Sequence, residues 1–105
     1  MIVDKIGLPA TLQQCAEECL ELALACLKMS RKLEGVNPTP KTFEEIHLNF
    51  IEEVADVSLC IDVLTNEAEL TYSDIIDSIK ESKNTRWLER LEQAAKEAGE
   101  TNELS

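Results

Sequence analysis

The stretch that decides the fold is residues 12–33, with the sequence LQQCAEECLELALACLKMSRKL. Apolar residues recur there in alternating steps of three and four, which is the pattern of a helix with a heptad-like seam. The seam consists of Leu12, Cys15, Cys19, Leu22, Cys26, Met29 and Leu33. A second apolar flank consists of Ala16, Leu20, Ala23 and Leu27. A helix that is apolar on two flanks needs more than one neighbour, so we expect both internal packing and self-association.

The ends of this predicted helix carry recognisable sequence signals. Thr11 followed by Gln14 predicts a capping box at its start, near residue 11. Gly35, Pro38 and Pro40 predict a loop over residues 34–41.

A second long helix is expected from Thr42 to about Asn66, because Thr42 and Glu45 form another capping box. Its core stripe is predicted to consist of Ile46, Phe50, Val54, Val57, Ile61 and Leu64.

Two short helices are predicted to complete the chain. The first begins at Thr71, with Asp74 as its capping partner, and a break is expected around Asn84 and Thr85. The second stops near Gly99. The sequence therefore predicts an all-α, compact four-helix-type bundle of two long and two short helices, assembled as a homo-oligomer. Residues 1–99 form its single domain, and residues 100–105 form a disordered acidic tail.

Composition excludes several classes of function. The formal net charge of −11 opposes binding to nucleic acid or to an anionic membrane. The sequence has neither an apolar run of transmembrane length nor a signal-peptide pattern, so a cytoplasmic location is expected. The four cysteines contain no Cys-x-x-Cys pair, and His47 is the single histidine, which argues against structural zinc. All four are predicted to be core or near-core thiols.

Four carboxylates occupy positions where charge is unfavourable. Glu18 and Glu21 lie in the most apolar part of the first helix, and Glu53 and Asp56 occupy a matching place on the second. Each pair is spaced i, i+3, so both members project from one side of their helix. Like charges in a partly buried position need a cation, and Mg²⁺ prefers carboxylate oxygens. If the helices pack antiparallel, the four acids can surround one or two ions, whereas Glu17 and Glu52 are expected to be ordinary surface charges.

These residues resemble a known family. Glu17-Glu18-Cys19-Leu20-Glu21 followed by Glu53-Val54-Ala55-Asp56 is similar to the EExxE…ExxD signature of MazG-like nucleoside triphosphate pyrophosphohydrolases, which are related to dimeric dUTPases. Residues 80–86, KESKNTR, resemble the K-x-x-x-N-x-R element of the same family. The resemblance covers roughly residues 12–91.

The resemblance implies hydrolysis of a nucleoside triphosphate, the substrate, to the monophosphate and pyrophosphate. It implies that Glu18, Glu21, Glu53 and Asp56 bind Mg²⁺, for which Mn²⁺ can substitute. Glu21 or Glu53 would act as the catalytic general base. It also implies that Lys80, Asn84 and Arg86 contact the phosphates or the sugar.

Two other functions remain open on the sequence. A di-iron carboxylate bundle would use Glu-x-x-His motifs on two helices. Glu44-x-x-His47 contains the single histidine of the chain, which argues against this function. A non-catalytic helical module would use the apolar flanks for oligomerisation only, or would bind a nucleotide without hydrolysing it.

Overall fold

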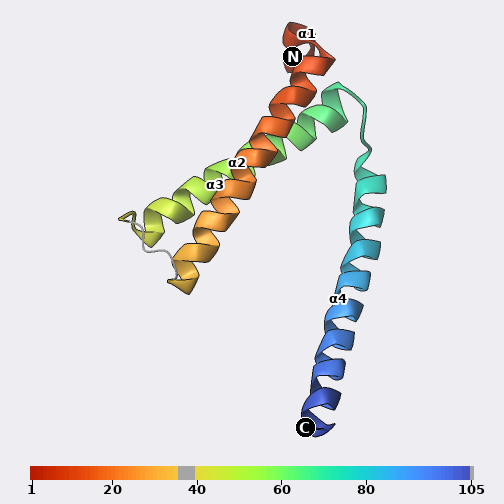
Figure 1. The fold of residues 1–105 in the computed structure, drawn as a ribbon. Helices are drawn as coiled ribbons and strands as arrows, with labels where there is room; N and C mark the ends of the chain where they lie inside the picture. The colour runs from red at the N-terminus through yellow and green to blue at the C-terminus, as the bar shows by residue number, and fades with distance from the viewer. Residues whose placement is uncertain (36–39, 105) are drawn as a thin grey trace. The chain divides into compact units, whose positions relative to one another are not determined.

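The computed structural model describes the backbone of residues 1–35 and 40–104, and the side chains within those ranges as far as residue 99. This part of the chain is 88% helical and contains no strand, so the all-α prediction is confirmed. The α-helices are α1 (Ile2–Ile6), α2 (Leu8–Glu34), α3 (Phe43–Asp62) and α4 (Ser73–Leu104) (Figure 1). A π-helical turn, η1 (Val63–Glu67), continues α3. None of these described helices is both long and apolar enough to cross a membrane.

Helix α2 begins three residues earlier than predicted. Gly7 separates it from α1 and has a positive φ of 84°, a conformation that glycine adopts without strain. Pro9 follows within the first turn, where its missing N–H has no cost. The predicted cap at Thr11 is wrong, because Thr11 lies inside the helix and its hydroxyl donates a hydrogen bond of 2.8 Å to the Gly7 carbonyl.

The other ends of the two long helices follow the sequence signals. Helix α2 ends at Gly35, which has the left-handed φ of 70° typical of a C-cap. Residues 36–39 of the predicted loop lie outside the described residues. Helix α3 begins as predicted, because the Thr42 hydroxyl accepts a hydrogen bond of 3.2 Å from the Glu45 N–H. The helical path then continues through η1 to Glu67, close to the predicted end.

Helices α2 and α3 pack against each other and form the main interface of the first unit, Met1–Leu70 (Figure 1). The face that α2 turns inward is rotated from the predicted seam. From Thr11 onward, the buried and half-buried side chains of α2 are Thr11, Cys15, Glu18, Leu22, Ala25, Met29 and Lys32. The matching side chains of α3 and η1 are Ile46, Phe50, Glu53, Val57, Cys60 and Val63. Glutamates therefore occupy one position in each inward face.

The predicted seam and stripe are only partly correct. Cys15, Leu22 and Met29 face inward, but the remaining seam residues, Leu12, Cys19, Cys26 and Leu33, are exposed. On α3, Val54 and Ile61 are exposed in the same way. The prediction that all four cysteines are core thiols fails for Cys19 and Cys26. The physical reason is that, within the first unit, α2 and α3 each cover only one stripe of the other.

Helix α1 was not predicted, and it packs on α2 and η1. The Val3 N–H donates a hydrogen bond of 3.2 Å to Glu67 Oε1, which ties α1 to the end of α3. At five residues α1 is too short to be stable alone, so this contact and the turn at Gly7 hold it.

The second unit, Thr71–Ser105, is built on α4 alone, and each unit is described by itself. The predicted break at Asn84 and Thr85 and the predicted stop at Gly99 are wrong, because α4 is continuous from Ser73 to Leu104. Thr85 is accommodated because its hydroxyl donates to the Glu81 carbonyl at 3.1 Å. Neither residue is a strong breaker, since each costs less than about 1 kcal/mol in a helix.

The structure thus has one long helix, α4, where two short helices were predicted. The side chains of the predicted tail, residues 100–105, lie outside the described part of the chain. The backbone of α4 continues to Leu104.

We expect Thr42→Ala to lower the free energy of unfolding by about 1 kcal/mol, because the Glu45 N–H loses its hydrogen bond to the Thr42 hydroxyl. Denaturant unfolding followed by circular dichroism measures the loss. Ser58→Ala, on the exposed side of the same helix, is the control and should change stability by less than about 0.5 kcal/mol. Equal effects of the two substitutions would contradict the assigned cap.

Candidate metal centre

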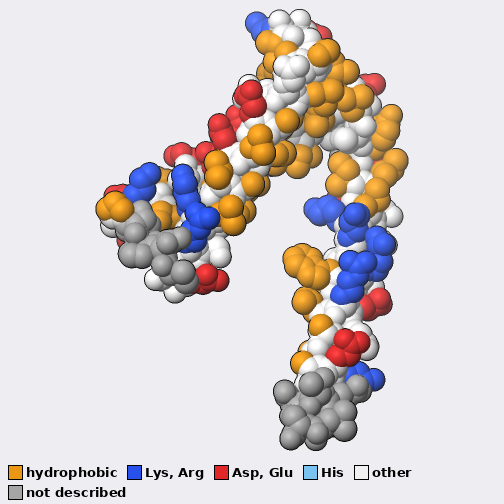
Figure 2. Space-filling model, viewed as in Figure 1, with side chains coloured by type: hydrophobic (Ala, Val, Ile, Leu, Met, Phe, Trp, Pro, Cys, Tyr) orange, Lys and Arg blue, Asp and Glu red, His pale blue; other side chains and the backbone are white. Residues whose placement is uncertain are grey.

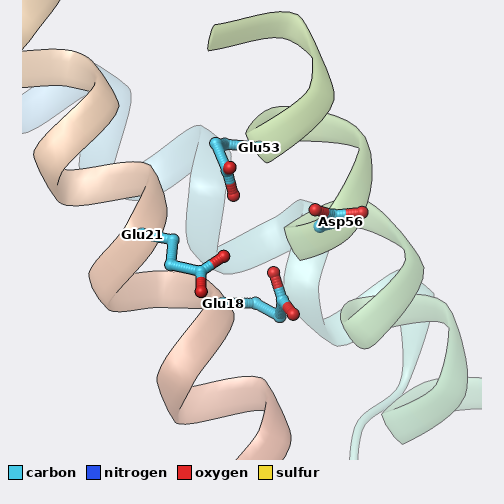
Figure 3. A group of neighbouring side chains, drawn as sticks. All are labelled: Glu18, Glu21, Glu53 and Asp56. Atoms are coloured by element: carbon cyan, nitrogen blue, oxygen red, sulfur yellow. The ribbon is translucent and has the colours of Figure 1, made fainter. Parts of the chain in front are cut away.

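The four acids predicted to bind metal converge between α2 and α3. Glu18 and Glu21 come from α2, and Glu53 and Asp56 come from α3 (Figure 3). The helices run antiparallel, so the i, i+3 spacing of one pair is matched by the same spacing of the other. Each carboxylate offers one oxygen, and these four oxygens all lie within 4.8 Å of one another. We call these four residues the acid cluster.

The separation of the oxygens is close to that of ligands around one divalent ion. Mg²⁺–O distances are about 2.0–2.1 Å, so two oxygens on opposite sides of the ion are about 4.2 Å apart. The 4.8 Å span of the acid cluster exceeds this by a few tenths of an ångström, which small rotations of the glutamate side chains can close. The donor set, four carboxylates, suits a hard cation such as Mg²⁺ or Mn²⁺.

Two oxygens of the acid cluster are buried without a hydrogen-bond partner. They are Glu18 Oε2 and Glu53 Oε2, and neither has a partner among the described residues. Buried polar atoms are normally hydrogen-bonded, and an unsatisfied buried oxygen is costly, more so when it carries charge. These orphaned oxygens are the feature that distinguishes the acid cluster from acids on a solvated helix face.

The other oxygen of Glu18 has a specific partner. Gln14 Nε2 donates a hydrogen bond of 2.9 Å to Glu18 Oε1. This bond lowers the pKa of Glu18, but desolvation and repulsion from Glu21 and Asp56 together outweigh it and leave the pKa above its ordinary value of 4.5. The neighbouring carboxylates and burial therefore oppose ionisation of Glu18, and a bound cation would offset both effects.

A pocket adjoins the acid cluster within the first unit. It is open to solvent, and its polar lining residues are Gln14, Glu18 and Asp56, together with Thr11. Its remaining walls are mostly apolar and come from α1, α2, α3 and η1. They consist of Ile2, Ile6, Cys15, Leu59, Cys60 and Val63. The apolar walls and the acidic residues together could accommodate a ligand with one apolar and one anionic part. The anionic part would need a cation between it and the carboxylates.

The three residues predicted to bind substrate all lie exposed on α4, in the second unit. Lys80 and Asn84 are one turn apart and line one shallow depression with Trp87. Arg86 lines a neighbouring depression with Lys83 and Arg90. Figure 2 shows these Lys and Arg side chains as a blue group on α4. The acid cluster and this cationic group thus belong to different units.

Several residues of these two regions were missed by the sequence analysis. Gln14 precedes Glu18 by one turn, so its role as a partner could have been predicted from the i, i+4 spacing. Lys83, Trp87 and Arg90 follow Lys80 at helical spacing, and this signal was hidden by the break predicted near Asn84. The pocket beside the acid cluster had no sequence signal, since α1 was not expected.

Other acidic and histidine candidates lie outside the acid cluster. Glu17 and Glu52 are exposed, as expected of surface charges. His47 stacks on Phe43 near the start of α3, with ring centroids 5.5 Å apart, and is exposed. Among the described residues the only group of potential metal ligands is the acid cluster, so Glu44 and His47 gain no support as a di-iron motif.

Comparison with known protein families, with characterised proteins and with solved structures gives no significant match. The function is therefore inferred from the residues of the acid cluster and their geometry.

The raised pKa of Glu18 predicts a pH dependence of stability in the absence of metal. The folded state holds this proton more tightly than the unfolded state, so the carboxyl favours folding below its ordinary pKa of 4.5. That contribution is lost as pH rises through the higher pKa of the folded state. We expect Glu18→Gln to be more stable than the wild type at pH 7 in EDTA, and the difference to shrink towards pH 4.

Denaturant unfolding at several pH values measures this difference, and Glu17→Gln, at an exposed position one residue away, is the control. A pH-independent difference between Glu18→Gln and the wild type would show that Glu18 is not strained by ionisation.

Proposed function

We propose that this protein is a Mg²⁺-dependent nucleoside triphosphate pyrophosphohydrolase, which hydrolyses its substrate to the monophosphate and pyrophosphate. The observation that carries the proposal is the convergence of Glu18, Glu21, Glu53 and Asp56 with two buried, unpartnered oxygens. The order of the motifs along the chain and the Lys-Asn-Arg element on α4 add to it. The free thiols suit a reducing compartment, so we place the activity in the cytoplasm.

The acid cluster fits the requirements of a Mg²⁺ site. Glu18 and Glu53 would each direct a buried oxygen to the ion, and Asp56 would complete the set from the more exposed side. When bound, Mg²⁺ neutralises phosphate charge and makes a bound water more acidic. The ion would thus let a strongly acidic surface accept a triphosphate that it would otherwise repel.

Glu21 and Glu53 are the two candidates for the general base. A base must keep an oxygen available to the attacking water, within about 2.6–3.2 Å. Glu21 is exposed and Glu53 is half-buried, with an oxygen that needs a partner. This difference favours Glu21 as the base and Glu53 as a metal ligand. The water would attack phosphorus, and the bond to the leaving pyrophosphate would break.

Lys80, Asn84 and Arg86 are proposed to bind the phosphates or the sugar of the substrate. All three are exposed on α4, and Lys83 and Arg90 extend the same cationic group. Positive charge aimed at phosphate oxygens stabilises the charge that develops during phosphoryl transfer.

Replacement of the acids tests the proposal. With Mg²⁺ and a panel of nucleoside triphosphates, we expect Glu53→Gln and Asp56→Asn to lower kcat/KM for pyrophosphate release by more than about 100-fold, since even an outer-shell partner of a metal contributes about 10–100-fold. Glu17→Gln, at an exposed position beside the motif, should retain activity within about 2-fold. Circular dichroism checks that the variants remain helical. A wild type that releases no pyrophosphate with Mg²⁺ or Mn²⁺ would refute the enzymatic function.

We also propose that the chain assembles as a homo-oligomer through the outer face of α2. Leu20, Leu24 and Leu27 are 67%, 57% and 50% exposed, and they lie on the side of the helix away from α3. The fully apolar part of the interior is small, since Cys15, Ala25, Ile46 and Val63 are the only buried hydrophobic residues among those described. A first unit of about 70 residues with so small an apolar interior gains stability when a partner covers its exposed leucines.

We expect the triple variant L20Q/L24Q/L27Q to weaken self-association by more than about 10-fold, because it removes the apolar area that would drive it. Sedimentation velocity across a concentration series measures the change, with Glu17→Gln, at an exposed charged position, as the control. A wild type that sediments as a monomer at micromolar concentration would contradict the proposal. An oligomer without hydrolysis would instead favour the non-catalytic helical module.

A further inference from the structure

A pair of cysteines lies next to the acid cluster and has no part in the proposed hydrolysis. Cys15 is buried on α2, and Cys60 is half-buried where α3 ends. Both line the pocket that opens to solvent, so a small solute can reach them. Cys19 and Cys26, on the same helix as Cys15, are exposed and do not line that pocket.

The positions of the two cysteines follow from the antiparallel packing of the helices. Cys15 precedes Glu18 by one turn on α2, and Cys60 follows Asp56 by one turn on α3. Because Glu18 and Asp56 meet in the acid cluster, an equal step towards the same end of the helix pair brings the two cysteines together. Cys15 and Cys60 accordingly line the same pocket from the two facing helices.

The spacing of packed helices also suits a disulfide. Helix axes are about 8–10 Å apart and Cα atoms lie about 2.3 Å from each axis, so residues facing each other have Cα atoms roughly 4–6 Å apart. A disulfide spans about 4.4–6.8 Å between Cα atoms.

The two thiols already influence each other in the reduced protein. Desolvation by burial, together with the hydrogen bond to Cys15, raises the pKa of the Cys60 thiol to about 12. The nearby Glu18 carboxylate acts in the same direction. Cys60 is thus held as a thiol, which slows its own attack on an oxidant.

We propose that Cys15 and Cys60 form an oxidisable dithiol, which hydrogen peroxide converts into an intrachain disulfide that clamps α2 to α3 one turn from the acid cluster. One thiol gives up its proton and its sulfur attacks the peroxide, which breaks the O–O bond and gives a sulfenic acid and, with that proton, water. The second thiol attacks the sulfenic sulfur, the S–S bond forms, and a second water leaves. The two thiols together lose two electrons and two protons, and the peroxide is reduced to two waters. The proposal is independent of the pyrophosphohydrolase activity.

The test uses the full chain as the variant C19S/C26S, in which only Cys15 and Cys60 remain. After treatment with hydrogen peroxide, alkylation under denaturing conditions counts the free thiols, and mass spectrometry identifies a cross-linked peptide. We expect both thiols to be lost, the chain to stay monomeric on a non-reducing gel, and dithiothreitol to restore both thiols. The melting temperature should rise by about 10 °C or more, since the bond closes a long loop in the unfolded chain.

The variants C15S/C19S/C26S and C19S/C26S/C60S are the matched controls, and neither should form an intrachain cross-link or gain stability. Two outcomes would overturn the proposal. One is oxidation of C19S/C26S to sulfinic or sulfonic acids without a cross-linked peptide. The other is a covalent dimer, which would show that the two cysteines meet between chains.

Discussion

The interaction on which the structure depends is the packing of α2 against α3, in which each inward face contains a glutamate at a position that an apolar residue would normally occupy. Glu18 and Glu53 each keep one oxygen buried and unpartnered among the described residues. The same packing that forms the interior of the first unit therefore concentrates negative charge between α2 and α3. Apolar residues at these two positions would pack without this penalty. The proposed cation would remove this penalty.

The position of the acid cluster could be predicted because helical spacing is rigid. Glu18 with Glu21 and Glu53 with Asp56 are each one turn apart, so antiparallel packing of α2 and α3 is enough to bring the four together. The cap at Thr42 and the glycine at residue 35 were equally readable, because each depends on its own local backbone. The face of α2 that turns inward was harder to predict. Apolar residues nearly encircle that helix, so periodicity alone could not separate the buried Cys15 from the exposed Cys19.

Features that depend on weak local preferences or on distant contacts could not be predicted. Asn84, Thr85 and Gly99 looked like helix breakers, but such residues cost little each, and α4 runs through all three. Helix α1 exists because Glu67, far along the chain, accepts a hydrogen bond from Val3. The pocket beside the acid cluster depends on that helix, as does the environment of Cys15 and Cys60.

Binding of a divalent cation by the acid cluster can be tested by X-ray diffraction from crystals grown with Mn²⁺, using its anomalous scattering to locate the ion. We expect an anomalous peak between α2 and α3, with oxygens of Glu18 and Glu53 bound directly and with Glu21 and Asp56 bound directly or through water. The absence of a peak there in well-ordered crystals at millimolar Mn²⁺, with the four carboxylates still converging, would contradict it.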